Sequence, residues 1–518
     1  MKWQGLGPTE PVRTEGGDLV GMLRRALDGI DRVGAAGGCG DVRAYFGIPY
    51  AAPPIGEARW CPPRPAAPWG GLRAAQAPAA QCVQSPRRPR SVYAEYSGDQ
   101  PMSEDCLTLN VFSAAEPGEA LPVMVWIHGG GHRQGAATNP VFTDGSLPCR
   151  GVVLVTINYR LGPLGFLCHP ELMAESEHGA CGNYALLDQI AALQWVSRNI
   201  AAFGGDPGCV TIFGQSAGGE AVGMLMASPL ARGLFHRAGI MSLGATRTPQ
   251  RAATQAEHGR QWGEWLGARS LAQLRALPAE ALLARDYAAG YVVDGWSLPT
   301  SARDAFRAGR QADVPLIAGW TLDDGSVFGP PITPPKFEGR VRASFGEHAD
   351  RVLALYPHAD EAQAQRANQD LFRERTFSWP AYSTVRYQMN TGRSPAWLYH
   401  HRHPQPFRDD QTFFEAPGHA SELGVFHSCD YPYLFGSLDQ LDRPWTDADH
   451  EVSALLQGLW TRFAHTGDPN GADLPRWPAF DASIRSTLRI QPKPVVAELP
   501  EAERLWLFDE LIGERGIG

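Results

Sequence analysis

The sequence predicts an α/β fold with a mostly parallel central sheet flanked by helices. Two observations carry this prediction: strand-like runs alternate with stretches of helical periodicity, and some of the runs are apolar throughout. The runs at 122–128 (PVMVWIH) and 152–160 (VVLVTINYR) are the clearest of these. A strand without apolar–polar alternation is buried on both faces, as in a parallel sheet covered by helices.

The other elements are predicted in chain order. Residues 1–38 are Gly-rich and weakly patterned, which predicts a loose lead-in, and the Pro-, Arg- and Ala-rich residues 61–100 predict a surface loop region. A helix is expected over 184–200, where Leu, Ile and Val recur at helical spacing. Further strands are expected within 41–54 and at 107–112, 210–212, 239–243, 314–320 and 396–401.

Two stretches interrupt the alternation of strands and helices. Residues 250–310 and 336–395 are rich in Ala, Arg, Glu and Gln, and this composition predicts helices. We expect them to form a cap over the carboxyl ends of the strands, where open α/β sheets bind ligands. No repeat or clean linker divides the chain, so residues 1–518 are expected to form one domain that carries these helical insertions.

Residues 209–220 (CVTIFGQSAGGE) predict a strand, a sharp turn and a helix around Ser216. The motif G-x-S-x-G in this context is a nucleophile elbow, in which the serine hydroxyl projects from the turn towards a substrate. Gly214 and Gly218 lack the Cβ atoms that would collide where the strand and the helix nearly touch. Ser216 is therefore predicted to be a catalytic nucleophile at a helix N-terminus.

A second glycine motif follows the buried strand at 122–128. Residues 128–132 (HGGGH) allow the backbone to approach a substrate and to direct N–H groups at one point. The N–H groups of Gly130 and Gly131, with that of Ala217 after the nucleophile, are the predicted oxyanion hole. A phosphate cradle is the rival interpretation, but no G-K-[ST] sequence follows the glycines.

Composition and charge exclude several classes of protein. The net charge is −9 and no basic run is present, so no nucleic-acid partner is expected. No run approaches about 18 apolar residues, which predicts no membrane span. The first residues contain no apolar signal-peptide core, so we expect a cytoplasmic protein, or a secreted one if a leader was removed. Nine cysteines without a C-x-x-C pair predict neither a disulfide scaffold nor a metal site, and no cofactor is expected.

Several stretches together resemble the type B carboxylesterase family, from about residue 40 to residue 480. Residues 104–111 (EDCLTLNV) and 213–219 (FGQSAGG) are similar to its two signatures. Matches also occur at 47–54, 158–160, 182–184, 203–207 and 466–470. The resemblance implies an α/β-hydrolase fold and hydrolysis of small to medium carboxylic esters through an acyl-enzyme. Lipase, amidase or thioesterase activity, and a non-catalytic neuroligin-like binding role, are the alternatives. The sequence is compatible with a monomer or a dimer.

The resemblance also selects the acid and the base of a catalytic triad. Residues 321–326 (TLDDGS) align Asp324 with the family's usual glutamate, and Asp323 is the rival. His427 and His419 both begin a His-x-x-Glu/Asp pattern, but only His427 continues into PYLFG as the family does. Ser216, Asp324 and His427 are therefore the predicted triad, in the order of α/β-hydrolases.

Further residues are assigned by the same comparison. Cys82 and Cys106 match a cysteine pair that closes a loop in secreted members of the family, and two reduced thiols are the alternative. Tyr96 stands where cholinesterases have a choline-binding Trp, and Gln215 replaces a frequent Glu, so a cationic substrate is disfavoured. His132 and Arg133, with Arg247, are predicted to line the pocket and to favour a polar or acidic substrate; a solvent-facing polar pair is the alternative. His400, His401 and His403 are ascribed to a strand with polar ends.

Overall fold

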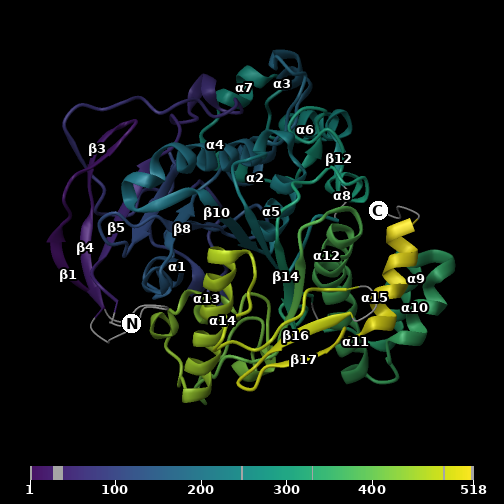
Figure 1. Cartoon of the computed structure of the whole chain (residues 1–518). Coiled ribbons are helices and arrows are strands. Elements are labelled where there is room, and N and C mark those ends of the chain that lie inside the picture. The colour runs from purple at the N-terminus through teal and green to yellow at the C-terminus, as the bar shows by residue number, and fades with distance from the viewer. Residues whose placement is uncertain (1–2, 27–38, 247–248, 330, 482–484, 515–518) are drawn as a thin grey trace.

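The computed structural model describes residues 3–26, 39–246, 249–329, 331–481 and 485–514. Its main feature is one large sheet, which extends in Figure 1 from β1 at the left to β17 at the lower right. The strands of this sheet are β1 (Trp3–Pro8), β4 (Met22–Ala26), β5 (Val42–Pro49), β7 (Thr108–Ser113), β8 (Leu121–Ile127), β9 (Val153–Ile157), β10 (Gly205–Gln215), β11 (Arg237–Met241), β14 (Leu316–Thr321), β15 (Ala396–His401), β16 (Ser486–Ile490) and β17 (Val495–Glu498).

The strand order confirms the predicted α/β architecture. Within the described residues the order is β1-β4-β5-β7-β9-β8-β10-β11-β14-β15-β16-β17. Each neighbouring pair from β9 to β16 is parallel, and the pairs at both edges are antiparallel. Because parallel strands run in one direction, the loops that follow β8, β10, β11 and β14 lie at the same edge of the sheet.

The apolar run of β8 is explained by burial on both faces of the sheet. Val123, Val125 and Ile127 pack in the core with helices α4 (Tyr184–Asn199) and α5 (Ala217–Ala227). Met124 and Trp126 alternate with them and pack in a second core with α14 (Asp447–Thr466). A strand with period-two side chains contributes to two cores, which is why its sequence shows no polar alternation.

Both predicted insertions are helical. The first contains α6 (Ala252–Trp265), α7 (Leu271–Ala276) and α8 (Ala302–Arg307). The second contains α9 (Pro334–Phe345), α10 (Ala349–Leu355), α11 (Glu361–Arg373), a π-helical turn (Glu374–Ser378) and α12 (Trp379–Thr391). Helix α12 packs on β14 and β15, so it belongs to the layer that covers the sheet (Figure 1).

The predicted loose lead-in is wrong for the residues that the structure describes. Besides β1 and β4, it contains β2 (Val12–Thr14) and β3 (Gly17–Val20), which form a small sheet with β6 (Leu72–Ala74). Residues 27–38 of this stretch lie outside the described residues. Strand β3 forms a hairpin with β2 and also pairs with β6, and β4 pairs with β1 and β5. Strands β1 to β4 have only three to six residues each, too few to show a clear alternation in a Gly-rich stretch.

The predicted disulfide between Cys82 and Cys106 is absent, since both are free, buried thiols. The hydrogen bond with Cys82, and then burial, raise the pKa of Cys106 and so favour the thiol form. Cys82 Sγ also accepts the backbone N–H of Leu161 at 3.3 Å. The structure instead joins Cys39 to Cys149, which are 110 residues apart.

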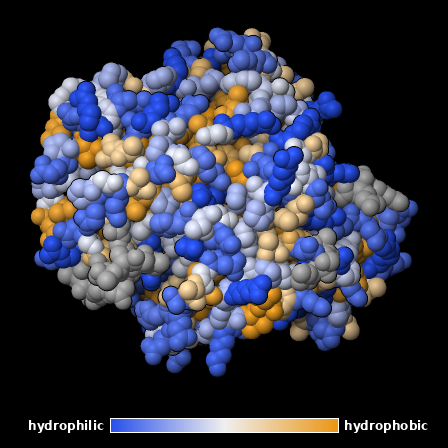
Figure 2. Space-filling view, in the orientation of Figure 1, coloured by the Kyte–Doolittle hydropathy of each residue, from blue (hydrophilic) through white to orange (hydrophobic). Residues whose placement is uncertain are grey.

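The face of the molecule seen in Figure 2 is hydrophilic over most of its area, with hydrophobic residues gathered in a few separate groups. Among the residues described, none of the helices combines the length and the apolar character that crossing a membrane requires.

Candidate active site

Ser216 occupies a strained turn between β10 and α5. Its φ of 57° and ψ of −126° lie where residues with a side chain are rare. A Cβ atom on Gly214 would lie 2.5 Å from the carbonyl carbon of Gly218, and one on Gly218 would lie 2.0 Å from the carbonyl oxygen of Ile127. Both positions therefore require glycine, and the turn holds Ser216 at the start of α5.

The glycine loop after β8 packs against this turn. A Cβ atom on Gly129 would lie 2.6 Å from the carbonyl oxygen of Gln215, and one on Gly130 would lie 1.9 Å from that of Gln134. Gly130 also has a φ of 114°, which favours glycine. Ala217 is the first residue of α5, so its N–H has no partner within the helix. The glycine loop and the start of α5 thus lie next to each other at Ser216, and free N–H groups at a helix start favour an anion.

His427 and Asp324 form a buried pair beside the elbow. The Nδ1 atom of His427 lies 2.7 Å from Oδ1 of Asp324. The other oxygen of Asp324 accepts hydrogen bonds from the Ser242 hydroxyl at 2.8 Å and from the backbone N–H of Thr321 at 2.9 Å. Because both carboxylate oxygens are bonded, Asp324 is held in one orientation towards the imidazole.

The two rival residues lie elsewhere. One oxygen of Asp323 pairs with Arg366 at 2.7 Å, and the other accepts the backbone N–H of Val425 at 2.9 Å. His419 is partly exposed, and its ring bonds to the Ser421 hydroxyl at 2.7 Å. The structure therefore brings Asp324 to His427 and leaves Asp323 and His419 out of the pair.

Gln215 contacts the other ring nitrogen of His427. Its amide Nε2 lies 3.1 Å from Nε2 of His427, and its Oε1 accepts a 2.6 Å hydrogen bond from the Tyr431 hydroxyl. A neutral imidazole that donates from Nδ1 to Asp324 accepts this amide at Nε2. In the described part of the chain, no hydrogen bond joins His427 to Ser216. Such bonds are often loose without substrate and tighten when it binds.

A cavity of about 490 Å³ contains Ser216 and His427. Its wall includes aromatic residues from the second insertion and the loop before it, and Phe377 stacks on the His427 ring at 4.3 Å between centroids. The further aromatic and polar residues that line it are Tyr93, Tyr96, Phe142, Phe328, Phe372, Thr376 and Tyr431.

The predicted pocket residues that the structure describes line this cavity but differ in exposure. Tyr96 is buried, and its hydroxyl accepts a hydrogen bond from Gln405 at 3.0 Å. His132 is only 2% exposed, and its Nε2 lies 2.9 Å from Glu220, so it is not a solvent-facing residue. Arg133 is exposed and pairs with Asp286 at 3.5 Å. Arg247 lies outside the described residues.

Other residues of the site were not anticipated from the sequence. Ser242 follows β11 at the same sheet edge as the elbow, a position that indicates function in an open α/β sheet. Tyr431 is four residues after His427, and nothing in the sequence indicates that its hydroxyl donates a hydrogen bond to Gln215. Arg87 lies in the stretch that was predicted to be a surface loop, and only the structure places it in the cavity.

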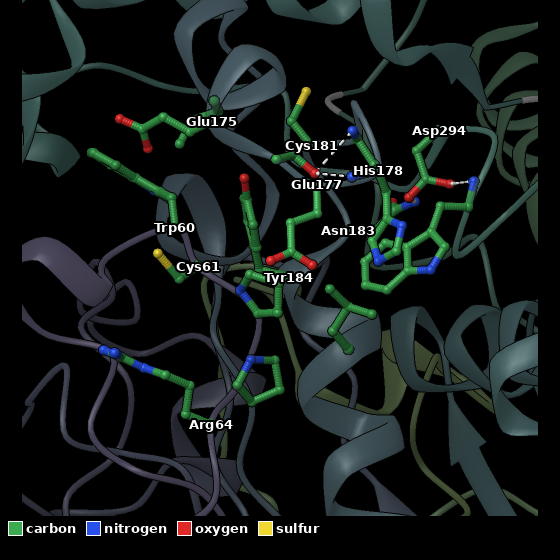
Figure 3. A pocket seen from close by; sticks show the side chains of 17 residues that line it. Trp60, Cys61, Arg64, Glu175, Glu177, His178, Cys181, Asn183, Tyr184 and Asp294 are labelled. Atoms are coloured by element: carbon green, nitrogen blue, oxygen red, sulfur yellow. Dashed lines mark hydrogen bonds between the residues drawn. The ribbon is translucent and has the colours of Figure 1, made fainter.

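A second cavity, of about 510 Å³, lies apart from these residues. Its one serine, Ser176, accepts hydrogen bonds from the backbone N–H groups of His178 at 3.3 Å and Ala180 at 3.2 Å. The His178 ring stacks on Trp296, so this cavity does not combine a serine with a histidine–carboxylate pair. Figure 3 shows Trp60, Cys61 and Arg64 on one side and His178, Asn183 and Asp294 on the other.

The cluster of His400, His401 and His403 lies at the end of β15, away from the catalytic cavity. His400 and His401 are fully buried, and burial lowers the pKa of His401 to about 3. His403 bonds to Asp449 at 2.8 Å. Across the described ranges, no three His, Cys, Asp or Glu side chains are grouped as ligands for a metal ion.

Comparisons with known proteins agree with this geometry. The model of the carboxylesterase family matches residues 12–507. A para-nitrobenzyl esterase from Bacillus subtilis (strain 168) is 35% identical over 490 residues, which cover 89% of this chain and 94% of the relative. A fumonisin B1 esterase from Sphingopyxis macrogoltabida is 34% identical over 463 residues, which cover 85% of this chain and 82% of the relative.

A solved structure shows the same fold. The structure of a PNB esterase superposes with a TM-score of 0.77 at 31% identity, covering 95% of this chain and 98% of that chain. The predicted α/β-hydrolase fold is therefore confirmed. The chain belongs to the carboxylesterase family and is a carboxylic ester hydrolase.

Proposed function

We propose that Ser216, His427 and Asp324 are the catalytic triad of this esterase. The observation that carries the proposal is the 2.7 Å hydrogen bond between His427 and the buried Asp324 in the cavity that also contains Ser216. Asp324 orients the imidazole and stabilises its cation, although it is one methylene shorter than the family's usual glutamate. The hydrogen bonds from Ser242 and Thr321 to the other carboxylate oxygen hold this shorter acid in place.

The reaction follows from these positions. His427 Nε2 exchanges its contact with Gln215 for the Ser216 hydroxyl and takes its proton as Oγ attacks the ester carbonyl. The N–H groups of Gly130, Gly131 and Ala217 stabilise the oxyanion, each by about 3–4 kcal/mol in the transition state. His427 then protonates the leaving alcohol. Water repeats the sequence on the acyl-enzyme and releases the acid.

We propose that residues 1–518 act as one catalytic domain and that its helical insertions form a cap over the active site. Ala289 from the first insertion and Phe372, Thr376 and Phe377 from the second line the catalytic cavity. Its volume of about 490 Å³ suits small to medium esters. The aromatic wall suits an apolar part of the substrate, and the polar groups lie around the reacting atoms.

Hydrolysis of short-chain p-nitrophenyl esters tests the triad. Ser216→Ala should lower kcat by about 10⁴-fold or more, because the nucleophile is lost while the oxyanion donors remain. Ser176→Ala, in the second cavity, is the matched control and should leave kcat near that of the parent enzyme. Retained activity in Ser216→Ala, with the fold intact by circular dichroism, would refute the assignment.

A further inference from the structure

An arginine lies beside the reacting groups. Arg87 lines the catalytic cavity together with Ser216 and His427. Its Nη2 atom lies 3.4 Å from the position that a Cβ atom on Gly130 would occupy, so the guanidinium is next to the oxyanion loop. It also lies over the Tyr93 ring, 5.5 Å from its centroid. The Arg87 guanidinium thus lies beside the oxyanion loop, in the cavity that contains Ser216.

This guanidinium has no neighbouring counter-charge in the part of the chain that the structure describes, where every Arg87 nitrogen is more than 4.0 Å from a carboxylate oxygen. Burial lowers the pKa of Arg87, and Tyr93, Tyr431 and Glu415 partly oppose this effect. Glu415 is itself bonded to the Ser91 hydroxyl at 2.6 Å and to the backbone N–H of Val92 at 3.0 Å. An arginine stays protonated even when it is desolvated, so the site carries a positive charge that lacks a close partner.

The acidic side chains near the cavity are hydrogen-bonded to histidines, and within the described residues none of them pairs with Arg87. Glu220 lies 2.9 Å from His132, and Asp324 lies 2.7 Å from His427. Gln215, next to Ser216, is a neutral amide. Arg133 also lines the cavity, but it is exposed and pairs with Asp286 at 3.5 Å. Arg87 is therefore the cation that an anionic group of a substrate in this cavity can approach.

We propose that Arg87 binds a carboxylate of the substrate, so that the preferred substrates are esters that carry a free carboxylate. Two kinds of ester have this chemistry. In a monoester of a dicarboxylic acid the free carboxylate is on the acyl side, and in a hydroxy acid that is acylated at its hydroxyl group the free carboxylate is on the alcohol side. The planar fork of a guanidinium matches a carboxylate with two parallel hydrogen bonds. The inference deepens the proposed function and rests on it.

Matched substrates isolate the charge. On the acyl side, a monoester of glutaric acid is compared with the ester of glutaramic acid, in which a carboxamide of nearly the same shape replaces the carboxylate. On the alcohol side, acetylated glycolic acid is compared with acetylated glycolamide. The parent enzyme should favour the carboxylate in at least one pair, by about 10- to 100-fold in kcat/KM, and that pair identifies the side that Arg87 contacts.

Substitution of Arg87 tests its role directly. Arg87→Met should remove the preference by lowering kcat/KM for the carboxylate ester while kcat/KM for the carboxamide ester changes little. Arg87→Lys should restore part of the preference, since the charge returns without the fork. Arg88→Met is the matched control, because Arg88 is exposed and lies over Phe414, 4.0 Å from its ring centroid.

Two results would overturn the proposal. Equal kcat/KM values for carboxylate and carboxamide esters in the parent enzyme would do so even if Arg87→Met fails to fold. If kcat/KM of folded Arg87→Met falls equally for the carboxylate and the carboxamide ester, Arg87 has a structural role and does not bind the substrate carboxylate. Failure of the triad assignment is recognised separately, because Ser216→Ala would then still hydrolyse the carboxamide esters.

Discussion

At the scale of single residues, the two adjacent aspartates make the sharpest comparison. Asp324→Asn should lower kcat by about 10⁴-fold, because an amide neither fixes the imidazole tautomer nor stabilises its cation. Asp323→Asn loses the partly exposed ion pair with Arg366, but its amide oxygen can still accept the backbone N–H of Val425, so kcat should stay within about threefold. Steady-state kinetics on a p-nitrophenyl ester measure both. The reverse order of losses would move the acid to Asp323.

Gln215 is the second residue whose role is testable. Gln215→Glu places a carboxylate against the His427 ring, where it stabilises the imidazolium and opposes proton transfer from Ser216. The acid limb of the pH profile of kcat/KM should therefore move to higher pH. Gln215→Leu is the neutral control, and it should change the rate without moving the limb. An equal displacement in both variants would exclude an electrostatic cause.

At the scale of elements, the glycine loop after β8 and the elbow after β10 act together. Gly130→Ala should lower kcat by about 10²–10³-fold, because its methyl group would lie 1.9 Å from the Gln134 carbonyl oxygen and displace an oxyanion donor. Gly131→Ala is the matched variant: its methyl group meets no atom within 4 Å, and only its φ of 64° opposes the change. The kcat of Gly131→Ala should therefore fall by about tenfold or less. Similar losses in both variants would contradict this account of the loop.

The elements also show how far the sequence alone could lead. The apolar runs of β8 and β9 and the G-x-S-x-G turn were recognisable because their constraints are local: burial on both faces, and glycines at a close approach. The N-terminal strands were missed because they have only three to six residues each, too few to show a clear alternation of apolar and polar residues. Arg87 was missed for another reason, since nothing in its own loop indicates that the loop reaches Gly130.

At the scale of the whole molecule, Asp430 links pH to stability. It is 1% exposed, and both its carboxylate oxygens lack a hydrogen-bond partner in another described residue. Burial, and then the charge of Asp324, raise its pKa to about 7 from a usual value of 3.8. Between these two values the folded protein binds a proton that the unfolded chain has released. The free energy of unfolding should therefore fall as the pH rises from about 4 to about 7.

Thermal unfolding between pH 4.5 and pH 8 measures this effect. The Tm of the parent enzyme should fall over that range, and Asp430→Asn should flatten the dependence because its amide does not titrate. An unchanged slope in the variant would show that other groups control stability in this window.

The whole molecule also explains the outcome of the site predictions. Sequence order and family resemblance proposed Ser216, Asp324 and His427, three residues spread over 212 positions, and the sheet brings their loops to one edge. The resemblance also suggested the Cys82–Cys106 bond, which the structure lacks. Motifs specify which residues meet, whereas oxidation state depends on conditions outside the chain.

Covalent labelling by diethyl p-nitrophenyl phosphate, followed by peptide mass spectrometry, tests the central assignment most directly. The reagent phosphorylates a serine that an imidazole has activated, and a neighbouring oxyanion hole accelerates the reaction. We predict one diethylphosphoryl group per chain, on the peptide that contains Ser216, with activity lost in proportion to labelling. Loss of activity with the label on another residue, or full labelling of Ser216 with activity retained, would contradict the account.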